Sequence, residues 1–328
     1  MMKYLEVFDQ NGLKAMKISE QRAPKNKDFE VKIAVYAAGV NRADILQRLG
    51  NYSPPEGISP ILGLEVAGEI VAIGCKVNGF KKGDRVMALL AGGGYAQFAV
   101  VDYRLLMPIP KHLDYIQAAG IPEVFLTAYQ TLFTLGGLRP KQQVLIHAGA
   151  SGVGTAAIQL ANICGAKVYV TVGSGEKVRF CQKLGADKAY NYKTQSWSKL
   201  LLEHTSGQGA DVILDCVGGD YLSKNIDCAA LDGKIILIAY MSNAWAKEIN
   251  LAKILKKRLI FKGTTLRSRS LAYKSDLIHS FNRHYMVALV NKELKPIIDQ
   301  VLPWELVDQA HQRMIQNLNK GKIILTIS

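Results

Sequence analysis

The sequence predicts an α/β protein in which a doubly wound, six-stranded parallel sheet is inserted between two parts of a β-rich domain. Three observations predict this fold. Short β-branched runs separated by glycine turns fill roughly the first 110 residues, strand and helix patterns alternate over residues 144–263, and an apolar strand covers residues 322–327. We therefore expect a β-rich domain at residues 1–124 and 266–328, and an α/β domain at residues 125–265.

The β-rich domain is predicted from its strand and turn signals. Alternating, β-branched residues run from Val31 to Val40, and a second apolar series, from Val66 to Val77, is interrupted by glycines. Further short runs cover residues 85–88 and 95–100. Short strands joined by tight turns account best for this pattern.

The α/β domain is predicted from regular alternation. Expected strands cover residues 144–148, 167–172, 188–192, 212–217, 234–239 and 259–263, and expected helices lie at residues 153–161, 176–184 and 222–231 and near Ile254. Six parallel strands with helices between them form the Rossmann pattern. Beyond this domain we expect helices at residues 274–291 and 304–318, before the last strand returns to the β-rich domain.

Composition narrows the classes of function. Of the 328 residues, 49% are hydrophobic and 21% are charged, as in ordinary globular proteins. The sequence has no run of about 18 apolar residues that would span a membrane, and Glu6 and Asp9 interrupt the segment where a secretion signal would be apolar. We therefore expect a cytoplasmic protein that does not cross a membrane.

The charged residues and the cysteines limit which binding partners and which metal or disulfide sites we expect. The net charge of +14 is compatible with nucleic acid, with an anionic membrane surface or with an anionic small molecule, but the 41 Lys and Arg residues form no long run. The cysteines are odd in number and never paired as Cys-x-x-Cys: Cys75, Cys164, Cys181, Cys216 and Cys228. This spacing argues against a disulfide framework and a zinc knuckle, and favours reduced thiols.

The strongest chemical signal is the segment from His147 to Gly154, which reads His-Ala-Gly-Ala-Ser-Gly-Val-Gly. It lies between an expected strand and an amphipathic helix, the position of a dinucleotide-binding turn. We expect Gly149 to permit the tight turn, Gly152 to let the backbone approach a pyrophosphate, and Gly154 to let the helix pack on the sheet. A purely structural turn is the alternative. His147 itself is expected to be a packed core residue rather than a general base.

The end of the next strand indicates which dinucleotide is bound. NAD-preferring sites place an acidic residue there, whereas this chain reads Val172-Gly173-Ser174-Gly175. A 2′-phosphate would find the Ser174 hydroxyl, backbone amides and the Lys177 cation, so we expect NADPH. Taken alone, Lys177 is equally well explained as a solvated helix residue, and Tyr192 is either a half-buried strand aromatic or a phosphate donor.

Ordered motifs extend over the whole chain. They are Asn41-Arg42-Ala43-Asp44, Gln47-Arg48-x-Gly50-x-Tyr52, Gly63-Leu64-Glu65-x-x-Gly68, Leu106-Met107-Pro108-Ile109-Pro110, residues 147–159 and Leu231-Asp232-Gly233. With these motifs the sequence resembles the zeta-crystallin-like NADPH:quinone oxidoreductases, zinc-free members of the medium-chain dehydrogenase/reductase superfamily. It is especially similar to the branch that contains the tumour-suppressor-inducible quinone oxidoreductase. The resemblance implies a GroES-like catalytic domain into which a Rossmann NADPH-binding domain is inserted.

The resemblance also implies a site without metal. Zinc-bearing relatives of the superfamily hold the catalytic metal with a Cys near position 41 and a His within a Gly-His-Glu turn. Here these positions are Asn41 and Leu64, and no cysteine lies between Cys75 and Cys164 for a structural zinc. Because a quinone is already electron-poor, its reduction needs less carbonyl polarisation than that of an aldehyde, so a quinone is the expected acceptor.

Three residues of the implied acceptor pocket are singled out. Tyr52 is expected to donate a hydrogen bond to the quinone oxygen, Asn41 to orient cofactor or substrate, and Asp44 to support its neighbours. The alternatives are a shielding loop aromatic for Tyr52 and a strand-ending turn residue for Asn41. Position 47 is Gln, where bacterial relatives often carry a second tyrosine, so this wall of the pocket is expected to be less aromatic.

The cofactor contacts that the resemblance implies lie mainly at the ends of the parallel strands, where this fold binds dinucleotides. They are Thr127, Gly149, Ser151, Gly152, Val153, Gly154, Gly173, Ser174, Lys177, Tyr192, Cys216, Val217, Gly218, Ala239, Tyr240 and Met241, with Arg267 as a guide for the phosphates.

Three functions remain open from the sequence. The first is NADPH-dependent reduction of ortho- or para-quinones, the second is NADPH-dependent reduction of activated alkenes such as 2-alkenals or enones, and the third is non-catalytic NADPH binding with affinity for RNA. Nucleic-acid binding is disfavoured because the sequence has no aromatic-basic motif and no Lys/Arg stripe. We expect a homodimer, with the strand at residues 259–263 as an edge that joins two sheets.

Overall fold

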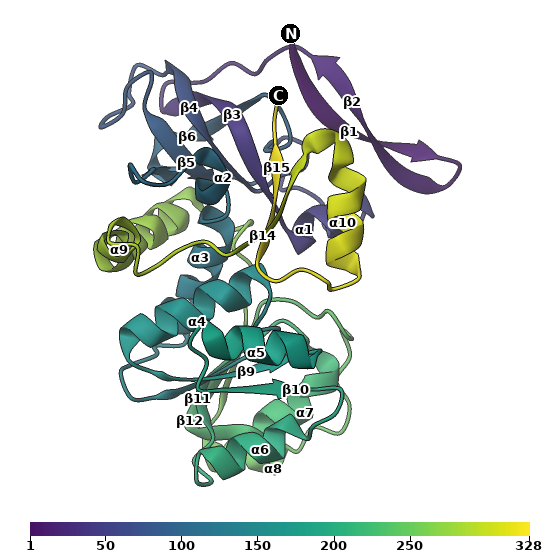
Figure 1. Ribbon diagram of the computed structural model, residues 1–328, viewed down its shortest axis with the longest axis vertical. Coiled ribbons are helices and arrows are strands. Elements are labelled where there is room, and N and C mark those ends of the chain that lie inside the picture. Colours follow the sequence, from purple (N-terminus) through teal and green to yellow (C-terminus); the bar gives the residue numbers. More distant parts are fainter. The chain divides into compact units, whose positions relative to one another are not determined.

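The computed structural model describes residues 1–328, except for the side chain of Leu13. It divides into two compact units (Figure 1). Unit 1 comprises Met1–Leu126 and Leu266–Ser328, and unit 2 comprises Thr127–Thr265. The predicted insertion of an α/β unit into a β-rich one is confirmed. Among the described residues, no helix is long and apolar enough to cross a membrane.

Unit 1 is built on a seven-stranded sheet in the order β14-β15-β3-β4-β5-β7, with β6 paired to β3. Its strands are β3 (Glu30–Val40), β4 (Glu65–Ile73), β5 (Arg85–Leu89), β6 (Phe98–Asp102), β7 (Leu106–Pro108), β14 (Ile298–Pro303) and β15 (Lys322–Thr326). A separate hairpin is formed by β1 (Met2–Gln10) and β2 (Leu13–Gln21). β15 pairs antiparallel with β3, Ile323 opposite Val40, so the chain returns to its first unit as expected.

The alternation that predicts β3 appears in its burial. Val31, Ile33 and Val35 point into the core and their neighbours lie nearer the surface, as a strand with one buried face requires. The residues from Ala37 to Val40 are buried on both faces. This buried end of β3 leads directly into the candidate site at Asn41.

Unit 1 also contains several helices. They are α1 (Arg42–Arg48), α2 (Tyr115–Ala118), α9 (Leu271–Val290) and α10 (Val307–Ile315), and α3 (Pro122–Tyr129) crosses the boundary of the units before a π-helical turn, η2 (Gln130–Leu135). α9 agrees with the predicted helix. α10 is shorter than predicted because a 3-10 turn, η3 (Trp304–Leu306), precedes it. The sequence did not indicate α1 or β14.

Unit 2 contains the predicted six parallel strands, in the order β10-β9-β8-β11-β12-β13. They are β8 (Gln143–Ile146), β9 (Lys167–Val172), β10 (Lys188–Asn191), β11 (Ala210–Asp215), β12 (Ala229–Leu237) and β13 (Ile260–Gly263). The order reverses between β8 and β11, which is the switch point where this fold binds ligands at the carboxyl ends of the strands.

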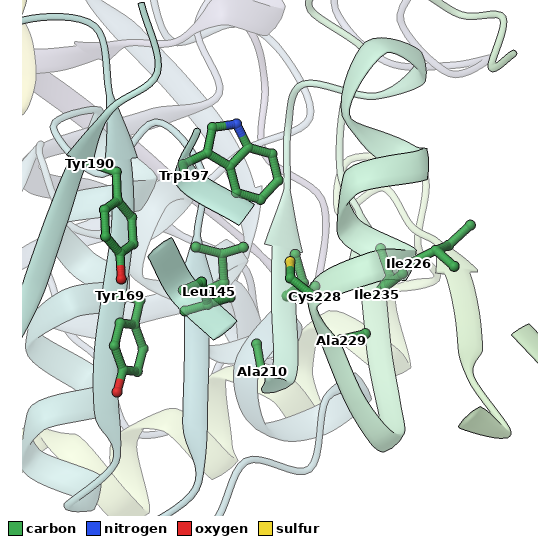
Figure 2. Close-up of a cluster of buried hydrophobic side chains, with 11 residues drawn as sticks. Leu145, Tyr169, Tyr190, Trp197, Ala210, Ile226, Cys228, Ala229 and Ile235 are labelled. Atoms are coloured by element: carbon green, nitrogen blue, oxygen red, sulfur yellow. The ribbon is translucent and has the colours of Figure 1, made fainter. Parts of the chain in front are cut away.

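Helices cover both faces of the unit 2 sheet (Figure 1). They are α4 (Gly152–Cys164) and α5 (Gly175–Lys183) on one face, and α6 (Trp197–His204), α7 (Gly219–Cys228) and α8 (Leu251–Lys257) on the other. Figure 2 shows the core of the second face, where Trp197 from α6 meets Leu145 and Tyr190 from the sheet. Loss of a buried side chain as large as Trp197 costs about 3–5 kcal/mol.

Candidate active site

The first predicted cofactor loop joins β8 to α4. Ser151 caps α4 by accepting a hydrogen bond from the Gly154 backbone N–H at 3.0 Å. A Cβ on Gly154 would lie 2.4 Å from the Ala148 carbonyl oxygen, so only glycine fits there. Gly149 lies in the expected tight turn, which the Ser151 N–H closes on the Ala148 carbonyl at 2.8 Å. The left-handed residue of the turn is Ala148, with φ of 53°, and glycine is needed at position 149 because a Cβ there would meet the Val170 side chain at 2.7 Å.

The N-terminus of α4 suits a dinucleotide pyrophosphate. The first backbone N–H groups of a helix have no partner within the helix, and the helix dipole places partial positive charge there. Gly152 and Val153 form this first turn, beside the switch point of the sheet. The loop therefore fits the group that the sequence predicts.

The second predicted loop joins β9 to α5. Ser174 caps α5, and its hydroxyl oxygen accepts from the Lys177 backbone N–H at 3.2 Å. Tyr192 follows β10 and is 43% exposed, and its hydroxyl oxygen lies 2.8 Å from the position of a Cβ on Gly173. The structure thus brings Gly173, Ser174 and Tyr192 together at the end of β9, with Lys177 in the first turn of α5.

The third and fourth predicted loops follow β11 and β12 and pair with each other. Met241 N–H donates to the Cys216 carbonyl at 3.1 Å, and Ser242 N–H donates to the Val217 carbonyl at 2.9 Å. The proposed contacts at residues 216–218 and 239–241 therefore form one surface. Thr127 contacts Thr131 in its own helical segment, and among the described residues no hydrogen bond joins it to these loops.

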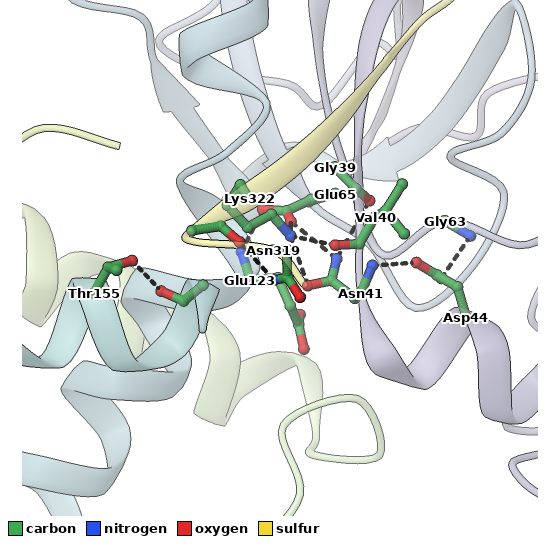
Figure 3. A network of polar contacts seen from close by, with 12 residues as sticks. Gly39, Val40, Asn41, Asp44, Gly63, Glu65, Glu123, Thr155, Asn319 and Lys322 are labelled. Carbon is green, nitrogen blue, oxygen red and sulfur yellow. Dashed lines mark hydrogen bonds and ion pairs between the residues drawn. The ribbon is translucent and has the colours of Figure 1, made fainter. Parts of the chain in front are cut away.

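Lys322 forms the centre of a buried polar network in unit 1 (Figure 3). Its ammonium group lies 2.6 Å from Glu65 Oε1 and donates to Asn41 Oδ1 at 2.8 Å and to the Val40 carbonyl at 2.7 Å. Asn41 donates in turn from Nδ2 to Glu65 Oε1 at 2.9 Å. The Lys322 and Glu65 side chains are 3% and 0% exposed, so each charge is paired with the other in the interior.

Asp44 lies beside this network and supports the start of α1. It accepts from the Asn41 backbone N–H at 2.8 Å, from the Tyr95 hydroxyl at 3.0 Å and from the Gly63 N–H at 3.1 Å. Burial raises the pKa of Asp44 to about 6, although these donors act in the opposite direction. The bonds give Asp44 a supporting role, and they leave the Asn41 amide engaged with Glu65 and Lys322.

Arg267 joins three segments of unit 1 around Tyr52. It is 4% exposed and donates from Nε to the Ala91 carbonyl at 2.7 Å, from Nη2 to Gln47 Oε1 at 2.7 Å and from Nη1 to the Tyr52 carbonyl at 3.3 Å. Its Cζ atom also lies 5.2 Å from the centroid of the Tyr52 ring, a cation–π distance. These contacts hold the Tyr52 loop within unit 1, and they do not support the phosphate role expected for Arg267.

The phenol of Tyr52 is kept protonated. Burial raises the pKa of Tyr52, the carboxyl of Glu123 raises it further, and Arg267 opposes both effects. At neutral pH the phenol can therefore donate a hydrogen bond. Gln47 donates to the Pro60 carbonyl at 2.7 Å and accepts from Arg267. Two hydrogen bonds therefore hold this polar side chain, at the position where the sequence predicts a less aromatic acceptor pocket.

Glu123 is a candidate site residue that sequence reasoning missed. It lies in the first turn of α3, and its backbone N–H donates to Glu65 Oε2 at 2.9 Å. Burial, and then the neighbouring Glu65 carboxylate, raise the pKa of Glu123 to about 8, so its carboxyl holds a proton at neutral pH. The one sequence signal was an acidic residue directly after Pro122 in an apolar stretch.

The residues around Asn41 do not form a zinc site. Zinc takes Cys, His or acidic ligands in a tetrahedral set, whereas this region holds Asn41, Leu64 and a Glu65 that is paired with Lys322. In the part of the chain that the structure describes, no group of three or more His, Cys, Asp or Glu side chains is arranged to hold a metal ion.

Two known families match the chain. The family described as alcohol dehydrogenase GroES-like domain matches residues 27–111, and the family described as zinc-binding dehydrogenase matches residues 152–281. A GroES-like unit with an inserted Rossmann sheet defines a medium-chain dehydrogenase/reductase.

Curated relatives match over the full length. The quinone oxidoreductase of Rattus norvegicus is 30% identical over 330 residues, which cover 100% of this chain and 98% of that protein. The chain belongs to the quinone oxidoreductase family of the medium-chain dehydrogenases/reductases. The highly-reducing polyketide synthase 1 of Aureobasidium melanogenum is 38% identical over 313 residues, which cover 94% of this chain and 14% of that protein.

Solved structures share the fold. A quinone oxidoreductase of Pseudomonas syringae has a TM-score of 0.85 at 26% identity, covering 99% of this chain and 100% of that one. The CurK enoyl reductase has a TM-score of 0.86 at 26% identity, covering 100% and 99%. An NAD-dependent alcohol dehydrogenase has a TM-score of 0.87 at 29% identity, covering 100% of both chains. The protein is therefore an oxidoreductase whose fold binds a nicotinamide cofactor, and the non-catalytic alternative is set aside.

Proposed function

We propose that this protein is an NADPH-dependent quinone reductase that works without a metal ion. The observation that carries the proposal is Tyr52, a half-buried phenol whose loop is held by the buried Arg267. Membership of the quinone oxidoreductase family and the likeness to the Pseudomonas syringae protein support a quinone as the acceptor.

The chain's own task in this reaction is to polarise and protonate an acceptor oxygen. The nicotinamide cofactor supplies a hydride when it is bound. Because burial raises the pKa of Tyr52, its hydroxyl keeps its proton and can donate to a quinone oxygen. The raised pKa of Glu123 keeps a second proton on a carboxyl in the same unit. Reduction of a quinone to a hydroquinone consumes a hydride and a proton, which suits a pocket of protonated groups.

The choice of NADPH over NADH rests on the loop between β9 and α5. Residues 172–175 carry no acidic group to accept from a ribose 2′-hydroxyl. The Ser174 hydroxyl, the Tyr192 hydroxyl and the Lys177 ammonium are instead donors for a 2′-phosphate. The other proposed contacts are the α4 N-terminus at Ser151–Gly154 and the paired loops at residues 216–218 and 239–241.

Metal independence rests on the network around Lys322. Its ammonium group supplies the positive charge that Glu65 requires, and Asn41 bonds to both. We therefore assign Asn41 and Asp44 the task of positioning α1 and the loop that follows it. Activity that survives a strong chelator is the expected consequence.

Tyr52→Phe tests the proposal, and Tyr36→Phe is its matched control. Tyr36 is 44% exposed on β3 and packs against Tyr115, with ring centroids 4.7 Å apart. With 1,2-naphthoquinone we expect Tyr52→Phe to lower kcat by about tenfold or more, since one polarising donor is lost, while NADPH affinity and the control stay unchanged. An unaltered kcat would return Tyr52 to a shielding role and remove the main support for the proposal.

Reduction of an activated alkene is the alternative. The likeness to the CurK enoyl reductase favours it. Both reactions need a donor at a carbonyl oxygen, so Tyr52 alone does not discriminate between them. Steady-state rates with 2-alkenals beside quinones do discriminate, because a higher kcat/KM for the alkenals would move the assignment to enone reduction.

We also propose a homodimer joined through β13. This strand forms one edge of the unit 2 sheet, and its Ile260 and Phe261 side chains are 49% and 50% exposed. An exposed sheet edge offers unpaired backbone groups to a second copy related by a two-fold axis. The cytoplasmic location stays a prediction.

A further inference from the structure

Four buried polar side chains of unit 2 form one chain of hydrogen bonds, which we call the polar relay. Thr171 Oγ1 lies 2.9 Å from His147 Nδ1, and His147 Nε2 lies 2.8 Å from Asn225 Oδ1. Asn225 Nδ2 donates to Asp215 Oδ2 at 3.0 Å. Thr171 is 1% exposed, and the other three residues are 0% exposed. The polar relay is therefore buried from bulk solvent.

The Asp215 carboxylate sets the direction of the polar relay. A carboxylate only accepts, so Asn225 donates to it through Nδ2 and turns its carbonyl oxygen toward His147. That oxygen accepts from His147, which must carry its proton on Nε2, and Nδ1 is left to accept from the Thr171 hydroxyl. Burial lowers the pKa of His147, which keeps the ring neutral and preserves this pattern.

The His147 ring is also fixed by packing. Its centroid lies 5.0 Å from that of Trp197 and 4.8 Å from that of Tyr221, both with the rings edge-on. Both ring nitrogens are used within the polar relay, so His147 is the packed core residue that the sequence predicts.

The polar relay lies directly beneath the proposed cofactor loops. At one end, Asp215 Oδ1 accepts from the N–H groups of Val217 and Gly218, at 2.7 and 3.1 Å, in the loop after β11. In the middle, His147 is the residue between β8 and the glycine turn of α4. At the other end, Thr171 precedes Gly173 by two residues at the end of β9. Four side chains thus connect the ends of three neighbouring strands.

We propose that His147 is a positioning residue for the nicotinamide cofactor, which acts through the polar relay on the loops after β8, β9 and β11. It transfers no proton and bonds only to protein. Its neutral ring, as donor on one side and acceptor on the other, fixes the spacing of loops that must contact one ligand together. The inference rests on nicotinamide binding by this fold and is independent of the acceptor chemistry, so it can fail while quinone reduction holds.

Thr171→Val breaks the polar relay with little change of volume, and Thr205→Val is its matched control. Thr205 is 5% exposed in the same unit, and its hydroxyl accepts from the Gly209 N–H at 2.9 Å and donates to the Leu202 carbonyl at 3.2 Å. This residue precedes β11 at the opposite end of the sheet from the cofactor loops.

We expect Thr171→Val to raise the Kd of NADPH about tenfold, because His147 Nδ1 loses its donor at a position buried from solvent. Thr205→Val should leave that Kd unchanged at a similar loss of Tm. Fluorescence titration of NADPH and thermal unfolding measure both quantities. Equal Kd values for the two variants would overturn the proposal, because the polar relay would then affect stability alone.

Two measurements on His147 provide independent checks. His147→Gln keeps an amide that can donate to Asn225, so it should recover most of the NADPH affinity that His147→Phe loses, and equal affinities would contradict the proposal. In the wild-type protein, 15N NMR of labelled histidine should report a neutral ring with its proton on Nε2. A proton on Nδ1, or a charged ring, would refute the assigned direction even if a variant fails to fold.

Discussion

Lys177 lies in the first turn of α5, beside the Ser174 cap and the end of β9. If its ammonium binds the 2′-phosphate, Lys177→Ala should weaken NADPH by about 1 to 3 kcal/mol, the value of a hydrogen bond to a charged group, and leave NADH nearly unchanged. Isothermal titration with both cofactors measures the difference. Lys183→Ala, in the last turn of the same helix, is the control. Equal losses of affinity for NADPH and NADH would contradict binding of the 2′-phosphate by Lys177.

Glu123 gives a prediction for the pH dependence of stability. Its pKa is about 8 in the folded protein against an ordinary value of 4.5, so the folded state binds this proton more tightly than the unfolded state does. The corresponding stability is present at low pH and is lost as the pH rises through the folded pKa, by at most about 1.4 kcal/mol per pH unit.

Glu123→Gln cannot ionise and should lack this loss. We therefore expect urea unfolding between about pH 5 and about pH 8 to show a pH-dependent difference. The free energy of unfolding of the variant minus that of the wild type should increase as the pH rises. Asp44, with a pKa near 6, is present in both proteins and cancels in the comparison. Glu56→Gln changes an exposed residue, so its free energy of unfolding should depend on pH as that of the wild type does. Parallel curves for Glu123→Gln and wild type would mean that Glu123 is ionised in the folded protein.

Among the elements, those of unit 2 were predictable because most of the strands are compact apolar runs and helices alternate with them along the chain. The exceptions have physical reasons. α6 is a short helix whose Trp197 and Leu201 enter the core, which its local pattern does not reveal. β12 begins at Ala229, inside the predicted helix, and its pairing with β11 shifts between Ala210 and Val212. β14 is an edge strand in which no residue is fully buried, so its hydrophobic pattern is weak.

The candidate site was predictable where it is local. The glycine turn of α4 and the cap of α5 are contiguous in sequence, and spacing alone locates them. The bonds from Lys322 to Asn41 and from Arg267 to Gln47 join residues 281 and 220 positions apart, and no local pattern encodes them. This is why Arg267 was expected at the phosphates, and why Glu123, whose pKa depends on Glu65, was not noticed.

The exposed edge at β13 makes the oligomeric state testable. Light scattering should give roughly twice the 36.0 kDa of one chain, as two copies pair along this edge. Phe261→Glu should shift the mass toward 36.0 kDa by placing charge on that edge, whereas Phe29→Glu, on a 44% exposed residue of unit 1, should not. A wild-type mass of one chain would remove the dimer.

At the scale of the whole molecule, the two units have separate tasks. Unit 2 carries the loops that we assign to the cofactor, with the polar relay beneath them. Unit 1 carries the protonated phenol and carboxyl that we assign to the acceptor, supported by Arg267 and by the network around Lys322. Neither task requires a metal ion in this account, because the positive charges are those of amino-acid side chains.

The most direct test of this account is NADPH oxidation with 1,2-naphthoquinone as acceptor after treatment with a strong chelator, run beside parallel reactions with NADH and with 2-alkenals. The account predicts quinone turnover that resists the chelator, is selective for NADPH and exceeds the rate with alkenals. Loss of turnover on chelation, or turnover with alkenals alone, would contradict it.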